Sequence, residues 1–236
     1  MIKVKRYTVL LVVGELLITA GVVLGAYVVY ELWVSNFAAK QTWSSSTNEL
    51  QSEFDLQYKK YLEANPTMAP EKVDLTEEPK PGKPFALLYV PKLWGNSNAV
   101  PILEGITDRD LARGLGHYPE TALPATEGNF AIAGHRATHG EPFAQFPLLA
   151  KGDELTVETL AGKYTYTLVG DIKVLPEDVW VIDPRPAISV VESLPPDAKL
   201  ITLTTCDPRW SSEKRWIWFG VQKSFTPRAQ LETSNP

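Results

Sequence analysis

The only cysteine of this 236-residue chain, Cys206, ends the threonine-rich stretch LITLTTC. Alternation along a strand would place Cys206 on the same face as Thr204. Pro208 cannot donate to a sheet ladder, so the strand ends at this point and Cys206 lies at a strand terminus. A lone cysteine is usually a small buried hydrophobe. At the rim of a sheet, however, a thiol could serve as a nucleophile.

Arg215 follows Cys206 by nine positions and begins another strand-like run, RWIWFGV. If the two runs form an antiparallel pair joined by DPRWSSEK, Cys206 and Arg215 face each other across the ladder. Directly opposed residues have Cβ atoms only about 4.5–5.5 Å apart. A guanidinium at that distance would favour the thiolate and could stabilise negative charge on a substrate oxygen.

A thiol nucleophile also needs a partner for its proton, and the chain has three histidines. His135 follows the apolar run NFAIAG, so it ends a strand as Cys206 does, which is the arrangement of a Cys/His pair. His117 lies in GLGHYP, and spacing alone does not separate it from His135. His139 lies in a glycine-containing loop and is expected to be a loop residue.

Eight short runs rich in β-branched and aromatic residues must position these side chains, and Gly, Pro, Asn and Asp separate them. The runs are FALLYVPKL, AVPILEG, GNFAIAGH, ELTVETL, KYTYTLVGDIKVL, VWVID, KLITLTTC and RWIWFGVQKSF. LAGK is expected to be a tight hairpin connection. Residues 107–115 and 141–150 are expected to be short helices or ordered loops. The pattern predicts a mostly β domain, closed or nearly closed into a barrel.

The N-terminus carries an apolar stretch preceded by Lys3, Lys5 and Arg6. A helix over residues 7–30 would reach about 36 Å, enough to cross a hydrocarbon core of about 30 Å. A cleaved signal peptide normally has a shorter apolar run. We therefore predict a cytoplasmic segment at residues 1–6, a transmembrane anchor at residues 7–34, and all later residues outside the cell membrane.

Two features of the span can be interpreted either as functional or as ordinary properties of a membrane helix. Glu15 is its one charge between residues 7 and 30, and an intramembrane carboxylate is a functional candidate; we favour a side chain that snorkels or is protonated. Gly21 and Gly25 form a GxxxG pair that would permit a weak homodimer through the transmembrane helix.

Two segments connect the anchor to the strands. Residues 35–63 carry Leu50, Phe54, Tyr58 and Tyr61 at helical spacings and are expected to be a partly helical stalk. Residues 64–84 are proline-rich and predict a semi-rigid linker. The catalytic domain is then expected at residues 85–228, with a C-terminal tail at 229–236.

Composition excludes several classes of function. A net charge of −5, with no basic cluster beyond the N-terminus, does not favour nucleic-acid binding. One cysteine cannot form an intramolecular disulfide, and with three histidines it does not favour a structural zinc site. We predict no metal and no cofactor.

The combination of TLTTC at 202–206, Arg215 and the upstream string GNFAIAGHR resembles the sortases, membrane-anchored cysteine transpeptidases of Gram-positive cell surfaces. GHYPETALPATEGNFAIAGHRATHGEPF and TTCDPRWSSEKRWIWFG are most similar to the class E sortases of actinobacteria. The resemblance covers residues 87–225 and the single N-terminal span. It implies an eight-stranded closed β-barrel.

The resemblance also implies roles for single residues. Cys206 matches the nucleophile, His135 the catalytic histidine and Arg215 the active-site arginine. The acidic calcium-binding residues of some class A enzymes have no clear counterpart.

Substrate binding is expected from three further residues. Thr205 matches a threonine that helps to hold the substrate, and Thr204 beside it is a second candidate. Tyr118 in GHYP matches a class E tyrosine associated with alanine instead of proline at the second position of the sorting signal. Trp210, Trp216 and Trp218 suit either peptide contact or packing, and we favour packing for the last two.

The function implied is cell-wall anchoring of secreted proteins that carry a C-terminal sorting signal. An LAxTG- or LPxTG-type signal would be cleaved between Thr and Gly through a thioacyl-enzyme, and a peptidoglycan precursor amine of the lipid II type would accept the protein. Two alternatives stay open: an extracytoplasmic cysteine hydrolase that uses the same residues, and a non-catalytic membrane-tethered binding barrel with a buried, inert Cys206.

Overall fold

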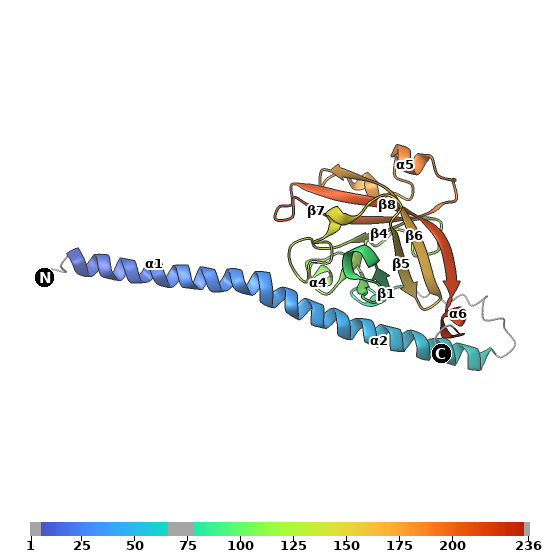
Figure 1. The fold of residues 1–236 in the computed structure, drawn as a ribbon, viewed down its shortest axis with the longest axis horizontal. Helices are drawn as coiled ribbons and strands as arrows, with labels where there is room; N and C mark the ends of the chain where they lie inside the picture. The colour runs from blue at the N-terminus through green and yellow to red at the C-terminus, as the bar shows by residue number, and fades with distance from the viewer. Residues whose placement is uncertain (1–5, 66–77, 234–236) are drawn as a thin grey trace.

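The computed structural model describes residues 6–65 and 78–233, and Figure 1 shows a long N-terminal helix lying beside a barrel of β-strands. Three of the segments expected from the sequence fall partly outside the described residues. These are residues 1–5 of the N-terminal segment, 66–77 of the linker and 234–236 of the tail.

The N-terminal helix consists of α1 (Arg6–Val29) and α2 (Ser35–Ala64), joined by one short π-helical stretch, η1 (Tyr30–Val34). Tyr7–Val29 is long and apolar enough to span a membrane, and none of it is buried against the barrel. The expected stalk is one continuous helix instead of a partly helical segment. A Cβ on Gly21 or Gly25 would meet open space, so the predicted helix dimer stays a prediction.

Eight strands close into a barrel in the order β1-β2-β3-β4-β7-β8-β6-β5. The strands are β1 (Pro84–Tyr89), β2 (Val100–Glu104), β3 (Leu115–His117), β4 (Gly128–Ala133), β5 (Glu154–Thr159), β6 (Gly162–Val174), β7 (Lys199–Asp207) and β8 (Lys214–Pro227). β2 and β3 pair in parallel, as do β4 and β7, and the other pairs are antiparallel. The predicted mostly β, closed barrel is confirmed.

One predicted strand is wrong, and another element takes its place. VWVID forms a 3-10 helix, η4 (Val179–Ile182). Its backbone carbonyls accept hydrogen bonds from a side chain instead of from a neighbouring strand, since Asn129 Nδ2 donates to Asp183 O at 3.0 Å. The eighth strand is β3, whose three residues are too few to show alternation. In the segment 107–115 the helix is only α4 (Asp108–Leu111), closed at its start by a capping box between Thr107 and Asp110.

The remaining helices are short. They are α3 (Pro91–Trp94), η3 (Phe146–Leu148), α5 (Ser189–Glu192) and α6 (Arg228–Thr233). η3 lies in the expected helix-or-loop segment 141–150. The predicted hairpin is present, since Thr159 at the end of β5 pairs with Gly162 at the start of β6.

The two faces of β7 pack against different groups of residues. Ile201 and Leu203 point into the barrel core, where Trp218 is also buried and Trp216 packs at the edge. Leu200 belongs instead to a second cluster outside the barrel, which includes residues of η4 and α5. Because strand residues alternate, Cys206 lies on the same outer face as Leu200.

α2 lies along the barrel, and its buried residues follow one face of the helix (Figure 1). That face consists of Asn36, Ala39, Trp43, Leu50, Phe54 and Tyr58. Of the four residues noted in the sequence, Leu50, Phe54 and Tyr58 lie on this packing face, while Tyr61 is only half-buried. The stalk and the barrel therefore share a core.

Candidate active site

Cys206, on β7, is paired directly with Arg215, on β8, in an antiparallel register. Cys206 is half-buried and its thiol forms no disulfide. The Arg215 guanidinium donates hydrogen bonds to the carbonyls of Ser212, at 3.1 Å, and Lys214, at 3.2 Å. Within the described ranges it forms no ion pair with a carboxylate, so its charge is not neutralised by a neighbouring acidic side chain.

The other side of Cys206 is occupied by the chain that leaves β4. Ala133 pairs with Thr204 in a parallel register, and the next residue stays attached, since Gly134 N donates to Thr204 O at 3.1 Å. The printed pairing ends at Ala133, and the same register carried on by two residues would place His135 opposite Cys206. The three candidate residues therefore lie on three adjacent segments, with Cys206 in the middle.

The His135 ring is half-buried, and its Nε2 atom is buried with no hydrogen-bond partner in the described part of the chain. It stacks on His139, with ring centroids 4.9 Å apart. Burial lowers the pKa of His135 below its ordinary value, and His139 lowers it further, while the carboxylate of Asp108 opposes both. At neutral pH the ring therefore favours its neutral form, which can accept a proton.

Two neighbouring residues hold the backbone at Cys206. Arg136 Nη1 donates to Cys206 O at 3.2 Å and pairs with Asp207, whose other carboxylate oxygen lies 2.9 Å from Lys173 Nζ. Burial disfavours the charged form of Asp207, but the hydrogen bonds and charges of Lys173 and Arg136 keep its pKa below the ordinary value. This contact was not predicted from the sequence. Its signal was an arginine directly after His135 and an aspartate directly after Cys206.

The three residues expected to bind substrate have different environments. The hydroxyls of Tyr118 and Thr204 are 3.0 Å apart. Thr204 precedes Cys206 by two positions on the same face of β7, so Tyr118 lies over that outer face. The Thr205 hydroxyl donates to Gly134 O at 2.8 Å, which ties β7 to the start of the His135 segment. Thr204 and Thr205 are both buried.

His117, the alternative partner for the thiol, belongs to a separate network. Its ring is 2% exposed, its Nδ1 lies 2.6 Å from Glu104 Oε2, and its Nε2 lies 2.9 Å from Thr121 Oγ1. Both ring nitrogens are therefore engaged away from Cys206. In residues 6–65 and 78–233 no group of three or more His, Cys, Asp and Glu side chains could hold a metal ion.

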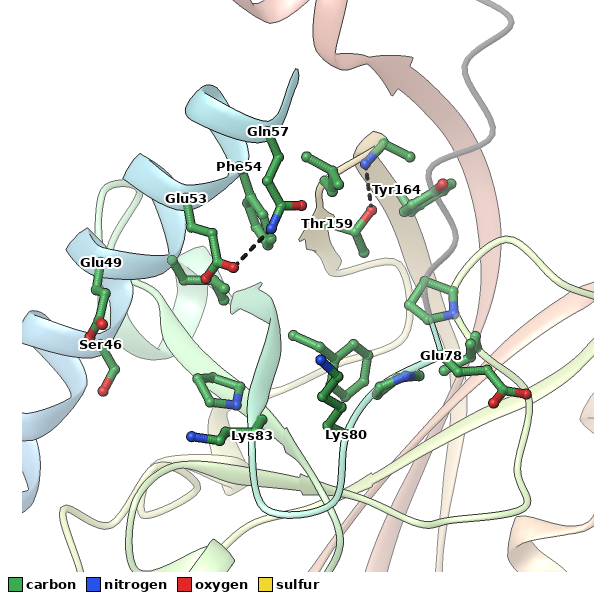
Figure 2. Close-up of a pocket in the computed structure, with 18 of the residues that line it drawn as sticks. Ser46, Glu49, Glu53, Phe54, Gln57, Glu78, Lys80, Lys83, Thr159 and Tyr164 are labelled. Atoms are coloured by element: carbon green, nitrogen blue, oxygen red, sulfur yellow. Dashed lines mark hydrogen bonds between the residues drawn. The ribbon is translucent and has the colours of Figure 1, made fainter. Parts of the chain in front are cut away.

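A separate cavity of about 460 Å³ lies between α2 and the end of the barrel that carries the β5–β6 hairpin (Figure 2). Its lining includes Glu53 and Gln57 of α2, Lys80 and Lys83 before β1, and Thr159. None of the candidate residues lines this cavity, so it is not part of the site around Cys206.

Comparison with known proteins shows the family. The sortase domain family matches residues 88–223, which include every candidate residue. The chain belongs to the sortase family. Sortases are cysteine transpeptidases, and this membership agrees with the pairing of Cys206 and Arg215.

Relatives and solved structures place this sortase near class E. Sortase SrtE1 of Streptomyces coelicolor is 37% identical over 92% of this chain, and the chain spans 58% of that relative's length. Sortase E of Streptomyces avermitilis is similar in structure, with 40% identity and a TM-score of 0.58 over 66% of this chain and 97% of the other. The structure of sortase E1 from S. coelicolor with a tripeptide in its active site matches at 37% identity and a TM-score of 0.58, over 67% of this chain and 98% of the other. The predicted family and its class E likeness are confirmed.

Proposed function

We propose that this sortase is anchored in the cell membrane by α1, with its barrel outside, and that Cys206, His135 and Arg215 carry out transpeptidation. It would cleave an LAxTG- or LPxTG-type sorting signal of a secreted protein between Thr and Gly, and transfer the threonyl carbonyl to an amine of a peptidoglycan precursor. The register that flanks Cys206 with Arg215 on one side and the His135 segment on the other carries this proposal.

In the first step the Cys206 sulfur attacks the threonyl carbonyl carbon. Neutral His135 accepts the thiol proton, and Arg215 donates to the carbonyl oxygen as negative charge develops on it. The C–N bond to glycine then breaks, and His135 returns the proton to the leaving amine. The products are a thioester on Cys206 and a released peptide with a free amino group.

In the second step the acceptor amine attacks the thioester carbonyl. His135 removes a proton from the attacking nitrogen, the C–S bond breaks, and the sulfur leaves as a thiolate that takes the proton back. An amide bond is formed and the enzyme is restored. Arginine suits both steps because it stays charged and presents fixed donors.

The sorting signal is expected to lie on the outer face of β7, beside Tyr118 and Thr204. Their hydroxyls are hydrogen-bonded at 3.0 Å, and Thr204 precedes Cys206 by two positions. The Tyr118 ring would therefore lie where the second residue of the signal binds. The tripeptide bound in the active site of the related S. coelicolor enzyme supports a peptide ligand here.

Two observations favour a catalytic thiol over the non-catalytic binding barrel. A half-buried Cys206 beside an arginine without a carboxylate partner in the described part of the chain argues against an inert core thiol. A hydrolase would use the same residues, so only the products separate the two reactions.

The test uses the full chain in lipid nanodiscs, with LAxTG and LPxTG peptides, with and without triglycine. Transpeptidation predicts a peptide–triglycine product by mass spectrometry, whose yield rises with triglycine at the expense of the hydrolysed peptide. Hydrolysis at the same rate whatever the triglycine concentration would assign the chain to the hydrolases.

A further inference from the structure

α2 fastens the barrel to the anchor helix at two places. Toward its end, Gln51 Nε2 donates to Tyr89 Oη at 2.9 Å, and Asp55 lies 3.1 Å from Arg228 Nη1. At its start, Asn36 accepts a hydrogen bond from Gly140 N at 2.7 Å. The apolar residues along the same face of α2 are buried: Ala39, Trp43, Leu50, Phe54 and Tyr58. The anchor helix and the barrel therefore form one packed unit.

The contact at Asn36 sets the height of the barrel above the membrane. Asn36 lies seven residues beyond Val29, where the apolar span ends. At a rise of 1.5 Å per residue, seven residues correspond to about 10 Å. The loop that Asn36 holds is therefore close to the level at which the hydrocarbon core ends.

The connection between β7 and β8 (residues 208–213) lies at the same level. Asn36 Nδ2 donates to Glu141, and Glu141 pairs with Arg209 of this connection. Figure 1 shows the β7–β8 connection extending from the barrel toward the side from which α1 arrives. It begins two residues after Cys206.

Three large aromatic side chains near this level are exposed. Trp33 is 74% exposed, Phe37 is 65% exposed and Trp210, in the β7–β8 connection, is 65% exposed. The Trp210 ring contacts the guanidinium of its neighbour Arg209, 5.1 Å from the ring centroid. Apolar area left in water costs about 25 cal/mol per Å², whereas the boundary between lipid headgroups and acyl chains favours tryptophan.

We propose that Trp210, together with Trp33 and Phe37, contacts the outer leaflet of the bilayer and holds the mouth of the site against the membrane. The occupant of this surface is the boundary between lipid headgroups and acyl chains. The inference rests on the proposed anchoring of α1 with the barrel outside. The contact would also explain why the site lies close to the membrane. An acceptor amine attached to a lipid headgroup would then be at the same height above the bilayer as Cys206.

The test measures depth in the bilayer. The full chain carrying Cys206→Ser receives one new cysteine by Trp210→Cys, is labelled with the fluorophore NBD, and is placed in nanodiscs with lipids brominated near the headgroup end of their acyl chains. Phe37→Cys is the positive reference. Leu56→Cys is the matched control. Leu56 is 54% exposed and lies on α2, as Phe37 does. At 1.5 Å per residue it is about 28 Å further from the membrane than Phe37.

The proposal predicts strong quenching of the label at position 210, at least half of that at position 37, and little at position 56. Quenching at position 210 no greater than at position 56 overturns it. This readout needs no enzymatic activity, so a failed transpeptidation assay with clear quenching at 210 would remove the proposed reaction and leave the membrane contact standing.

Discussion

The side-chain carbonyl of Asn36, at the start of α2, accepts a hydrogen bond from the backbone N–H of Gly140 at 2.7 Å. Gly140 lies between His139 and Glu141, and all three have positive φ angles, of 53°, 85° and 55° in chain order. Non-glycine residues adopt this region only where their surroundings hold them there. The anchor-side helix thus shapes the loop whose His139 stacks on His135.

Asn36→Ala is expected to destabilise the protein and to loosen this loop. Asn36 is buried, and its loss leaves the Gly140 N–H without its acceptor, which costs about 1–3 kcal/mol. If the His139 stack loosens, His135 becomes better solvated and the acid limb of kcat/KM against pH moves to higher pH. Urea denaturation and a pH–rate profile measure the two effects. Asn48→Ala is the control, since Asn48 is an exposed asparagine on the same helix, and it should change neither the stability nor the pH profile. If Asn36→Ala lowers stability without moving the acid limb, Asn36 does not position His135.

Arg215→Ala is expected to lower kcat/KM by about 10²–10³, the typical effect of removing one donor to a developing oxyanion. Arg215→Lys should recover only part of this, because an ammonium does not reproduce the planar fork of donors. Lys214→Ala is the control, since Lys214 is exposed and only its backbone carbonyl contacts Arg215. Equal losses for the Lys214 and Arg215 variants would contradict the role given to Arg215.

The acid limb of kcat/KM should lie below pH 6.5, because burial and His139 lower the pKa of His135. His139→Gln removes the neighbouring imidazole that lowers the pKa of His135 and should move the limb to higher pH. Asp108→Asn removes the opposing carboxylate and should move it to lower pH. Profiles of the two variants that shift in the same direction would show that another group controls the limb.

Asp207→Asn should weaken folding at neutral pH but not in acid. The pKa of Asp207 is lower in the folded protein than in the unfolded chain, so its stabilising effect is present above the unfolded value of about 3.9 and is lost as pH falls through the folded value. Denaturant midpoints of wild type and Asp207→Asn should therefore differ at pH 7 and converge as pH falls below about 4. A difference that stays constant with pH would assign the effect to packing instead of charge.

The sequence was sufficient for the barrel and for the pairing of Cys206 with Arg215. Strand alternation and one proline break fixed the end of β7, and the nine-residue spacing then determined the register. VWVID was mistaken for a strand because its composition is that of a strand, while the Asn129 side chain that bonds its carbonyls comes from another part of the chain. β3 was missed because three residues carry no periodicity.

The sequence could not separate His135 from His117, since the choice depends on the parallel pairing of β4 with β7. Nor could it show Arg136 holding the Cys206 carbonyl or Asn36 holding Gly140. Each of these contacts joins residues at least 70 positions apart, and local patterns do not record such distances.

Covalent catalysis by Cys206 is tested on the acylated protein itself. The full chain is mixed with an LAxTG peptide without added amine, quenched in acid, and analysed by intact and peptide-level mass spectrometry. A thioacyl-enzyme predicts an adduct with the mass of the peptide up to its threonine, located on Cys206, absent from Cys206→Ala and discharged by triglycine. An adduct that persists in Cys206→Ala, or cleavage of the peptide without an adduct on Cys206 at any time, would contradict it.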